Sequence, residues 1–184
     1  MVLKIAIFTI STITIGFISR ASLASPRSHG FTRFLSWEAI LCLFVLNLDG
    51  WFTDPFSWHQ VLSWTLLAGS LVPLVLGVAK LKEQGRQEEG NREDSSLYRF
   101  EKTTRLVTDG IYGYIRHPLY SSLLLLVLGI FLKAPSLEGG GVMVVACILL
   151  IITALRDERE CREYFGDGYR DYMKRTKRFI PFLF

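Results

Sequence analysis

Five long apolar stretches dominate this sequence of 184 residues and leave little chain outside them. They cover residues 2–19, 34–52, 58–79, 118–132 and 137–155. Because about 20 helical residues cross a bilayer, the first three are long enough to span one, and the last two form a tighter hairpin. Half of the residues are hydrophobic, and the mean hydropathy is +0.31. We therefore expect an all-α fold, a polytopic membrane helix bundle of about five spans with a cytosolic C-terminal helical tail.

The basic residues predict the orientation of this bundle. With five spans, all of the 21 Lys and Arg residues except Lys4 and Lys133 fall in loops on one side of the membrane. The positive-inside rule then places the N-terminus outside or in the lumen and the tail in the cytosol. The membrane would be the endoplasmic reticulum in a eukaryote and the inner membrane in a prokaryote. A cleaved signal peptide would reverse the basic loops, so we expect the first stretch to be a span.

The chain divides into two parts at a charged segment. Residues 82–96, KEQGRQEEGNREDSS, contain no apolar side chain and predict a solvated linker. We expect N-terminal spans and this cytosolic linker in residues 1–96, and a cofactor-binding helical hairpin and tail in residues 97–184. After the last span, the pattern predicts a continuing helix to Phe165, a break at Gly166 and Gly168, and a short amphipathic helix beyond them.

Two acidic residues, Glu38 and Asp49, accompany the second apolar stretch. A helix would place both on nearly the same face. Acids within a span usually face the bundle interior, whereas acids near its ends can be solvated by lipid headgroups. Both alternatives remain open from the sequence.

Several kinds of site find no support in the sequence. The three cysteines, Cys42, Cys147 and Cys161, show no zinc-ligand spacing and are expected to be small buried hydrophobic residues, so we expect no metal. No glycine-rich nucleotide-binding motif follows a strand. We expect no nucleic acid partner and no obligate protein partner.

The segment 104–120, TRLVTDGIYGYIRHPLY, leads directly into the fourth apolar stretch. Proline suits the first helical position, so His117 is predicted to be the N-cap and Pro118 the first residue of the helix. A helix start of this kind attracts a carboxylate or phosphate. The hairpin brings it close to Asp157 and Glu158, and together they could bind an amino-acid-like zwitterion. Taken singly, each feature is more often a topological anchor or a solvated helix face.

A set of motifs in this half resembles a known family. The motifs are GIYGYIRHPLY at 110–120, the apolar hairpin, the acidic pair, FG-x-x-Y-x-x-Y at 165–172 and RFIP at 178–181. Over residues 97–184 they resemble the isoprenylcysteine carboxyl methyltransferase family, whose relatives include membrane phospholipid methyltransferases. The resemblance implies a small membrane enzyme that uses S-adenosylmethionine to methylate a lipid or lipidated substrate entering from the bilayer. The C-terminal carboxyl of an isoprenylcysteine is the first expectation for the acceptor, and a phospholipid amine is the alternative.

The resemblance also implies site residues. The expected cofactor-binding residues are Thr104, Arg105, Leu106, Val107, Tyr112, His117, Pro118, Leu119, Tyr120, Asp157 and Glu158. The family has a substrate-binding arginine where this chain has Thr153, and Arg116, Arg156 or Arg159 could replace it. We expect the catalytic residues to be Arg116, Arg156 and Glu158.

A second enzyme class shares part of this pattern. The segment RDE-x-x-C at 156–161 is similar to one in membrane sterol reductases, which use a reduced nicotinamide cofactor. Those enzymes have more spans and lack the Pro-x-Tyr spacing found here. A non-catalytic membrane protein of this shape is the third alternative.

Overall fold

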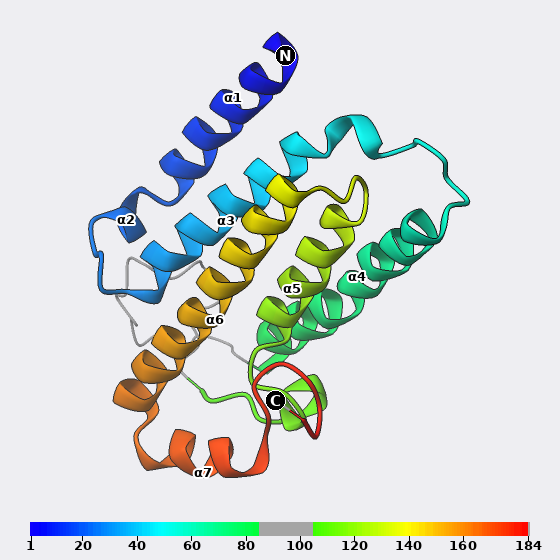
Figure 1. Cartoon of the computed structure of the whole chain (residues 1–184). Coiled ribbons are helices and arrows are strands. Elements are labelled where there is room, and N and C mark those ends of the chain that lie inside the picture. The colour runs from blue at the N-terminus through cyan, green and yellow to red at the C-terminus, as the bar shows by residue number, and fades with distance from the viewer. Residues whose placement is uncertain (85–104, 184) are drawn as a thin grey trace.

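The computed structural model describes residues 1–84 and 105–183, and this part of the chain is helical (Figure 1). The elements are α1 (Val2–Ile18), α2 (Arg20–Leu23), α3 (His29–Leu46), η1 (Leu48–Gly50), α4 (Trp58–Gln84), η2 (Gly110–Gly113), α5 (Pro118–Phe131), α6 (Leu137–Phe165) and α7 (Asp167–Arg175). The expected all-α class is confirmed. Most of the predicted linker, residues 85–96, lies outside the described residues, and so does the expected boundary after residue 96.

Five apolar helices overlap the five predicted stretches, although α3 begins and ends earlier than the predicted 34–52. Helices α3, α4 and α6 are long and apolar enough to cross a membrane, and α1 and α5 are shorter apolar helices. In the bundle α4 packs on α5, α5 on α6, and α6 on α3, while α1 lies outside them along α3 (Figure 1). The span count of five stays a prediction.

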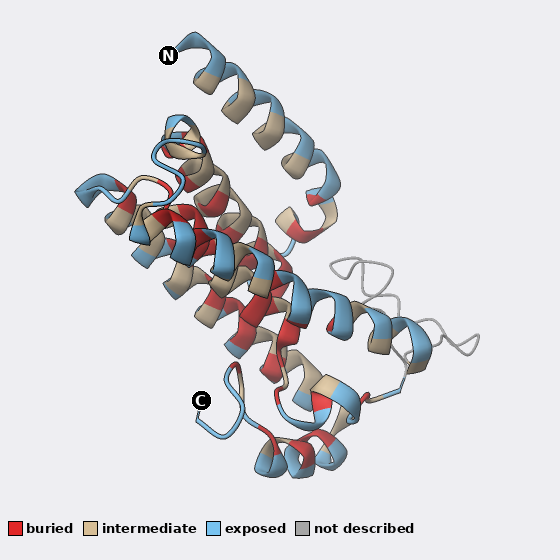
Figure 2. Ribbon diagram, turned by 90° about the vertical axis from the view of Figure 1, so that its right-hand side faces the viewer, coloured by how far each residue is buried: buried red, intermediate tan, exposed pale blue. Residues whose placement is uncertain are grey.

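The core lies where α3, α5 and α6 meet, as the concentration of buried residues in the bundle shows (Figure 2). Leu43, Val127 and Leu150 are completely buried there. By contrast, α1 has no buried residue, and α4 exposes apolar side chains such as Leu71 and Val75. An apolar surface of this extent needs a lipid environment, and the molecule is therefore an integral membrane protein.

The structure corrects the expected placement of Glu38 and Asp49 on one helical face. Helix α3 ends at Leu46, and Asp49 lies in the following η1 turn, so the two acids do not share a helix. The chain turns because the Asn47 side chain donates to the Ile130 carbonyl at 2.8 Å. Lys4 pairs with Asp49 at 2.8 Å, and the Thr12 hydroxyl donates to Glu38 at 2.7 Å. Both acids therefore attach α1 to the remainder of the bundle.

A buried lysine organises the end of the bundle where η1 meets the α5–α6 connection, here called the Lys133 end. Lys133 is 1% exposed, and its ammonium donates to the Gln60 side chain at 2.9 Å. It also lies 3.5 Å from the centre of the Trp64 ring. Burial lowers the pKa of Lys133. The cation–π contact and the hydrogen bond to the Gln60 amide replace the hydration that this ammonium loses on burial.

The opposite end, here called the pocket end, contains the loops that the sequence predicted to be basic. It brings together residues 19–29, 80–84, 105–117 and 156–180, through contacts such as that of Gln84 with Asp109 at 2.6 Å and of Arg156 with the Pro26 carbonyl at 2.8 Å. Helix α6 continues to Phe165 as expected, and Gly166 follows at a φ of +59° that favours glycine. The short amphipathic helix α7 then lies across this end of the bundle (Figure 1).

Candidate functional site

The start of α5 has the geometry expected from the sequence. His117 is the N-cap, Pro118 is the first helical residue, and no side chain caps this helix. Backbone N–H groups in the first turn of a helix have no partner within the helix, and they favour an anionic ligand. The tip of α5 is therefore available as an anion receiver.

The chain after α7 fixes the loop in front of α5. The Arg116 N–H donates to the Lys177 carbonyl at 2.8 Å, and the His117 N–H donates to the Arg178 carbonyl at 3.1 Å. The Lys177 N–H returns a bond to the Tyr114 carbonyl at 3.0 Å. We call residues 176–179 the docked tail. It holds the backbone of the Arg-His-Pro motif in one conformation.

Glu158 joins this tail to α6. Its carboxylate accepts bonds from Arg116 Nε at 2.9 Å and from Arg178 Nε and Nη2, each at 3.0 Å. The Glu158 side chain is 3% exposed and, although expected to bind the cofactor, does not line the pocket described below. Two guanidinium groups neutralise the carboxylate, which allows it to be buried.

The Asp157 side chain points in a different direction from that of Glu158. Consecutive residues of an α-helix point roughly 100° apart, so only one member of the acidic pair can face a given cavity. Asp157 is 25% exposed, and its Oδ2 lies 3.6 Å from His117 Nδ1. It also accepts a bond from the Cys161 thiol at 3.5 Å.

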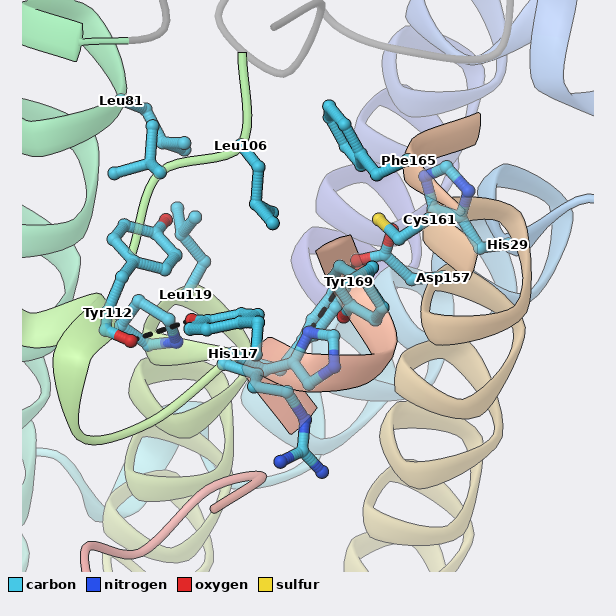
Figure 3. A pocket seen from close by; sticks show the side chains of 15 residues that line it. His29, Leu81, Leu106, Tyr112, His117, Leu119, Asp157, Cys161, Phe165 and Tyr169 are labelled. Atoms are coloured by element: carbon cyan, nitrogen blue, oxygen red, sulfur yellow. Dashed lines mark hydrogen bonds and ion pairs between the residues drawn. The ribbon is translucent and has the colours of Figure 1, made fainter. Parts of the chain in front are cut away.

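These elements enclose a pocket of about 120 Å³, many times the ~10–15 Å³ that one water molecule needs (Figure 3). Nine of the expected site residues line it: Leu106, Val107, Tyr112, Arg116, His117, Pro118, Leu119, Tyr120 and Asp157. Tyr112 and Asp157 lie on opposite walls of the pocket, with His117 between them (Figure 3).

Other expected site residues lie elsewhere. Thr104 is outside the described residues, and Arg105 is exposed and does not line the pocket. Arg156 donates to the Pro26 and Ser28 carbonyls, at 2.8 and 3.3 Å, and Glu158 is engaged with the tail.

The structure adds six lining residues that the sequence analysis did not select: His29, Leu81, Cys161, Phe165, Tyr169 and Tyr172. For Cys161, Tyr169 and Tyr172 the sequence contained a pattern that could have indicated this position. Cys161 follows Asp157 by four residues and so shares its helix face, and Tyr169 and Tyr172 lie on the helix that was expected to be amphipathic. His29 and Leu81 had no such pattern, because only the packing of α3 and α4 around the hairpin brings them here.

The α7 tyrosines are neutral wall residues. Tyr172 donates its hydroxyl to the Tyr112 carbonyl at 2.7 Å, and burial raises the pKa of both Tyr169 and Tyr172 well above the ordinary value. Within the described residues, His117 Nε2 is a buried nitrogen without a hydrogen-bond partner, 3.4 Å from Glu158 Oε1. The pocket thus combines an anion-receiving helix start, a carboxylate and a largely aromatic wall.

Comparison with known proteins supports the family recognised from the motifs. Residues 91–168 match the model of the family described as phospholipid methyltransferase. Methanethiol S-methyltransferase 1 of Bradyrhizobium diazoefficiens is 30% identical over 79 residues, which are 42% of this chain. The chain spans about a quarter of the length of this curated relative, with 26% of the relative aligned. No solved structure matches the chain.

Residues that line the pocket on α5 and α6 fall within the matched segment. The matched segment is thus similar to methyltransferases.

Proposed function

We propose that this protein binds S-adenosylmethionine in the pocket at the start of α5 and transfers its methyl group to a lipophilic acceptor. The observation that carries the proposal is the junction of an uncapped helix start, the Asp157 carboxylate and an aromatic wall in one pocket. S-adenosylmethionine supplies an electrophilic methyl group on a positively charged sulfur. The protein itself binds the two reactants, orients them toward each other and excludes water from the site.

The lining residues fit the chemistry of this cofactor. The N–H groups at the start of α5 suit a carboxylate, and Asp157 suits an ammonium group or ribose hydroxyls. Tyr112, Leu81 and Leu106 offer an apolar surface for a flat heterocycle. Among residues 1–84 and 105–183, no group of three or more His, Cys, Asp or Glu side chains could hold a metal ion.

The acceptor is a separate question from the cofactor. An isoprenylcysteine carboxylate needs a cation, and the family's arginine position is Thr153, a buried residue whose hydroxyl lies 3.4 Å from Ser36. Of its three expected substitutes, Arg156 and Arg116 are engaged with backbone carbonyls and Glu158, and Arg159 is exposed in a pair with Glu163. The matched relative's name points to a thiol and the family's to a phospholipid. We propose an uncharged or cationic acceptor entering from the bilayer, with the pocket end in the cytosol.

Calorimetric titration of the purified protein in detergent tests the cofactor assignment. Charge-assisted bonds contribute about 1.5–3 kcal/mol, and each 1.4 kcal/mol is a tenfold change in affinity. Asp157→Asn should therefore weaken S-adenosylmethionine binding about ten- to a hundredfold. Asp167→Asn is the matched control, since Asp167 is 88% exposed on α7, and it should bind like the wild type.

Reduced nicotinamide dinucleotide is the second titrant in the same experiment. The methyltransferase proposal expects no heat from it. Nicotinamide binding without S-adenosylmethionine binding would instead identify a reductase and reject the proposal.

A further inference from the structure

His29 contributes to the pocket from outside the matched segment. It is the first residue of α3, far in sequence from α5 and α6, and it is 1% exposed. Its ring nevertheless lines the pocket, on the α6 side and across from Tyr112 (Figure 3). An imidazole in this place can touch a molecule that enters.

Glu160 holds His29 at two points. One carboxylate oxygen accepts the His29 backbone N–H at 2.7 Å, and the other lies 2.5 Å from the ring nitrogen Nδ1. The first bond fixes the start of α3, and the second fixes the ring. A carboxylate on Nδ1 keeps the proton there and leaves the lone pair on Nε2.

The other ring nitrogen of His29, Nε2, could accept a proton. Among the described residues, the ring of His29 is held through Nδ1, by Glu160, and Nε2 is the nitrogen that this contact leaves over. A carboxylate–imidazole pair with a free Nε2 on a pocket wall is the arrangement used in general base catalysis, where the carboxylate orients the ring and stabilises the imidazolium. A structural helix cap would need only the backbone bond.

Several charged groups surround the His29 ring. Asp157 and Glu160 lie close to it on α6, and Arg33 lies one turn further along α3. The other ionisable groups on the pocket walls are Cys161, Tyr169, Tyr172, Tyr112, Tyr120, Arg116 and His117. Acidic neighbours stabilise a positive imidazolium and repel an anionic acceptor.

We propose that His29, oriented by Glu160, is the general base of this methyltransferase, and that the acceptor is a thiol or amine that loses a proton on methylation. This inference rests on the proposed function and specifies its substrate class. A carboxylate acceptor has no proton to lose, so the Glu160–His29 pair would not be needed for its methylation.

The proposed step is a direct transfer of the methyl group from the donor to the acceptor. The acceptor's sulfur or nitrogen forms a bond to the methyl carbon, while the carbon–sulfur bond of the sulfonium donor breaks and its electron pair stays on that sulfur. The acceptor's proton passes to His29 Nε2. Glu160 neutralises the imidazolium until water takes the proton after product release.

Three substitutions in the full chain test this assignment: His29→Gln, Glu160→Gln and, as a control, His59→Gln. His59 is matched in type but lies at the Lys133 end, where it contacts the Leu132 carbonyl at 3.0 Å. The acceptors are a short alkanethiol, a long-chain alkylamine and a prenylated cysteine carboxylate. Each variant is first titrated with S-adenosylmethionine by calorimetry.

His29→Gln should bind S-adenosylmethionine within twofold of wild type but methylate the thiol or amine about a hundredfold more slowly, since positioned bases contribute about 10²–10⁴-fold. Added imidazole should restore part of the rate. The wild-type rate should rise with pH as His29 loses its proton, and this rise should be absent from His29→Gln. His59→Gln should behave like the wild type.

A spectroscopic measurement completes the test without turnover. Nitrogen NMR of histidine-labelled protein should show His29 with its proton on Nδ1, and Glu160→Gln should change that signal. A proton on Nε2, equal rates in His29→Gln, or preferred methylation of the carboxylate would overturn the inference. Failure of the wild type to bind S-adenosylmethionine would instead reject the proposed function itself.

Discussion

At the scale of single residues, the two neighbouring acids of α6 have separate tasks. Asp157 faces the pocket, whereas Glu158 lies behind it between Arg116 and Arg178. The sequence analysis expected both acids to bind the cofactor. The structure instead makes Glu158 the junction through which the docked tail is attached to the hairpin.

Substitution of Glu158 should therefore act mainly on stability. Glu158→Gln removes the buried carboxylate that Arg116 and Arg178 share, and breaking a buried pair in this way costs about 3–5 kcal/mol. We expect a lower midpoint of thermal unfolding in detergent and faster proteolysis after α7. Glu163→Gln is the control, because its pair with Arg159 on the same helix is exposed on both sides and stabilises little. Equal unfolding midpoints for the two variants would contradict this account.

At the scale of helices, α4 and α5 approach each other closely toward the Lys133 end of the bundle. A Cβ on Gly129 would lie 2.8 Å from Leu67 Cγ and 3.2 Å from the Leu67 backbone nitrogen. The Ser63 hydroxyl donates to the Gly129 carbonyl at 2.7 Å, which joins the two helices at the same level. Small residues and hydroxyls of this kind allow helices to pack closely inside a membrane.

Gly129→Ala should separate these helices. Overpacking typically costs about 1–3 kcal/mol, so we expect a loss of thermal stability of this size. Gly69→Ala is the matched control, since Gly69 lies within α4 and a Cβ there would meet nothing within 4 Å. The control should be neutral or slightly stabilising. An unchanged midpoint in Gly129→Ala would show that the α4–α5 interface can relax.

At the scale of the whole molecule, the orientation in the membrane is open to a direct test. Phe56 is 93% exposed near the Lys133 end, and the Arg170 side chain is 65% exposed at the pocket end. In a background without the three native cysteines, Arg170→Cys should react with an impermeant maleimide from the cytosolic side of sealed membranes. Phe56→Cys should react only from the opposite side. The reverse labelling pattern would mean that the pocket faces away from the cytosol.

The sequence predicted the helices well because apolar runs, glycine breaks and the Pro118 helix start are local signals. It predicted the N-cap at His117 and the amphipathic α7 for the same reason. It misplaced Asp49 and Glu158 because their surroundings come from distant segments, namely Lys4 and the docked tail. His29 was missed on the same ground, since its approach to Glu160 depends on how α3 packs against α6.

The position of the docked tail has a consequence for biogenesis. A ribosome delivers His29 first, the Arg-His-Pro loop much later, and α7 with residues 176–179 last of these parts. The five apolar helices can enter the bilayer as they emerge, but the Arg116 and His117 N–H groups meet their acceptors only after Lys177 and Arg178 have been synthesised. The helices of a nascent chain can therefore be inserted before the pocket is complete. The pocket is completed only after the residues that follow α7 have been synthesised.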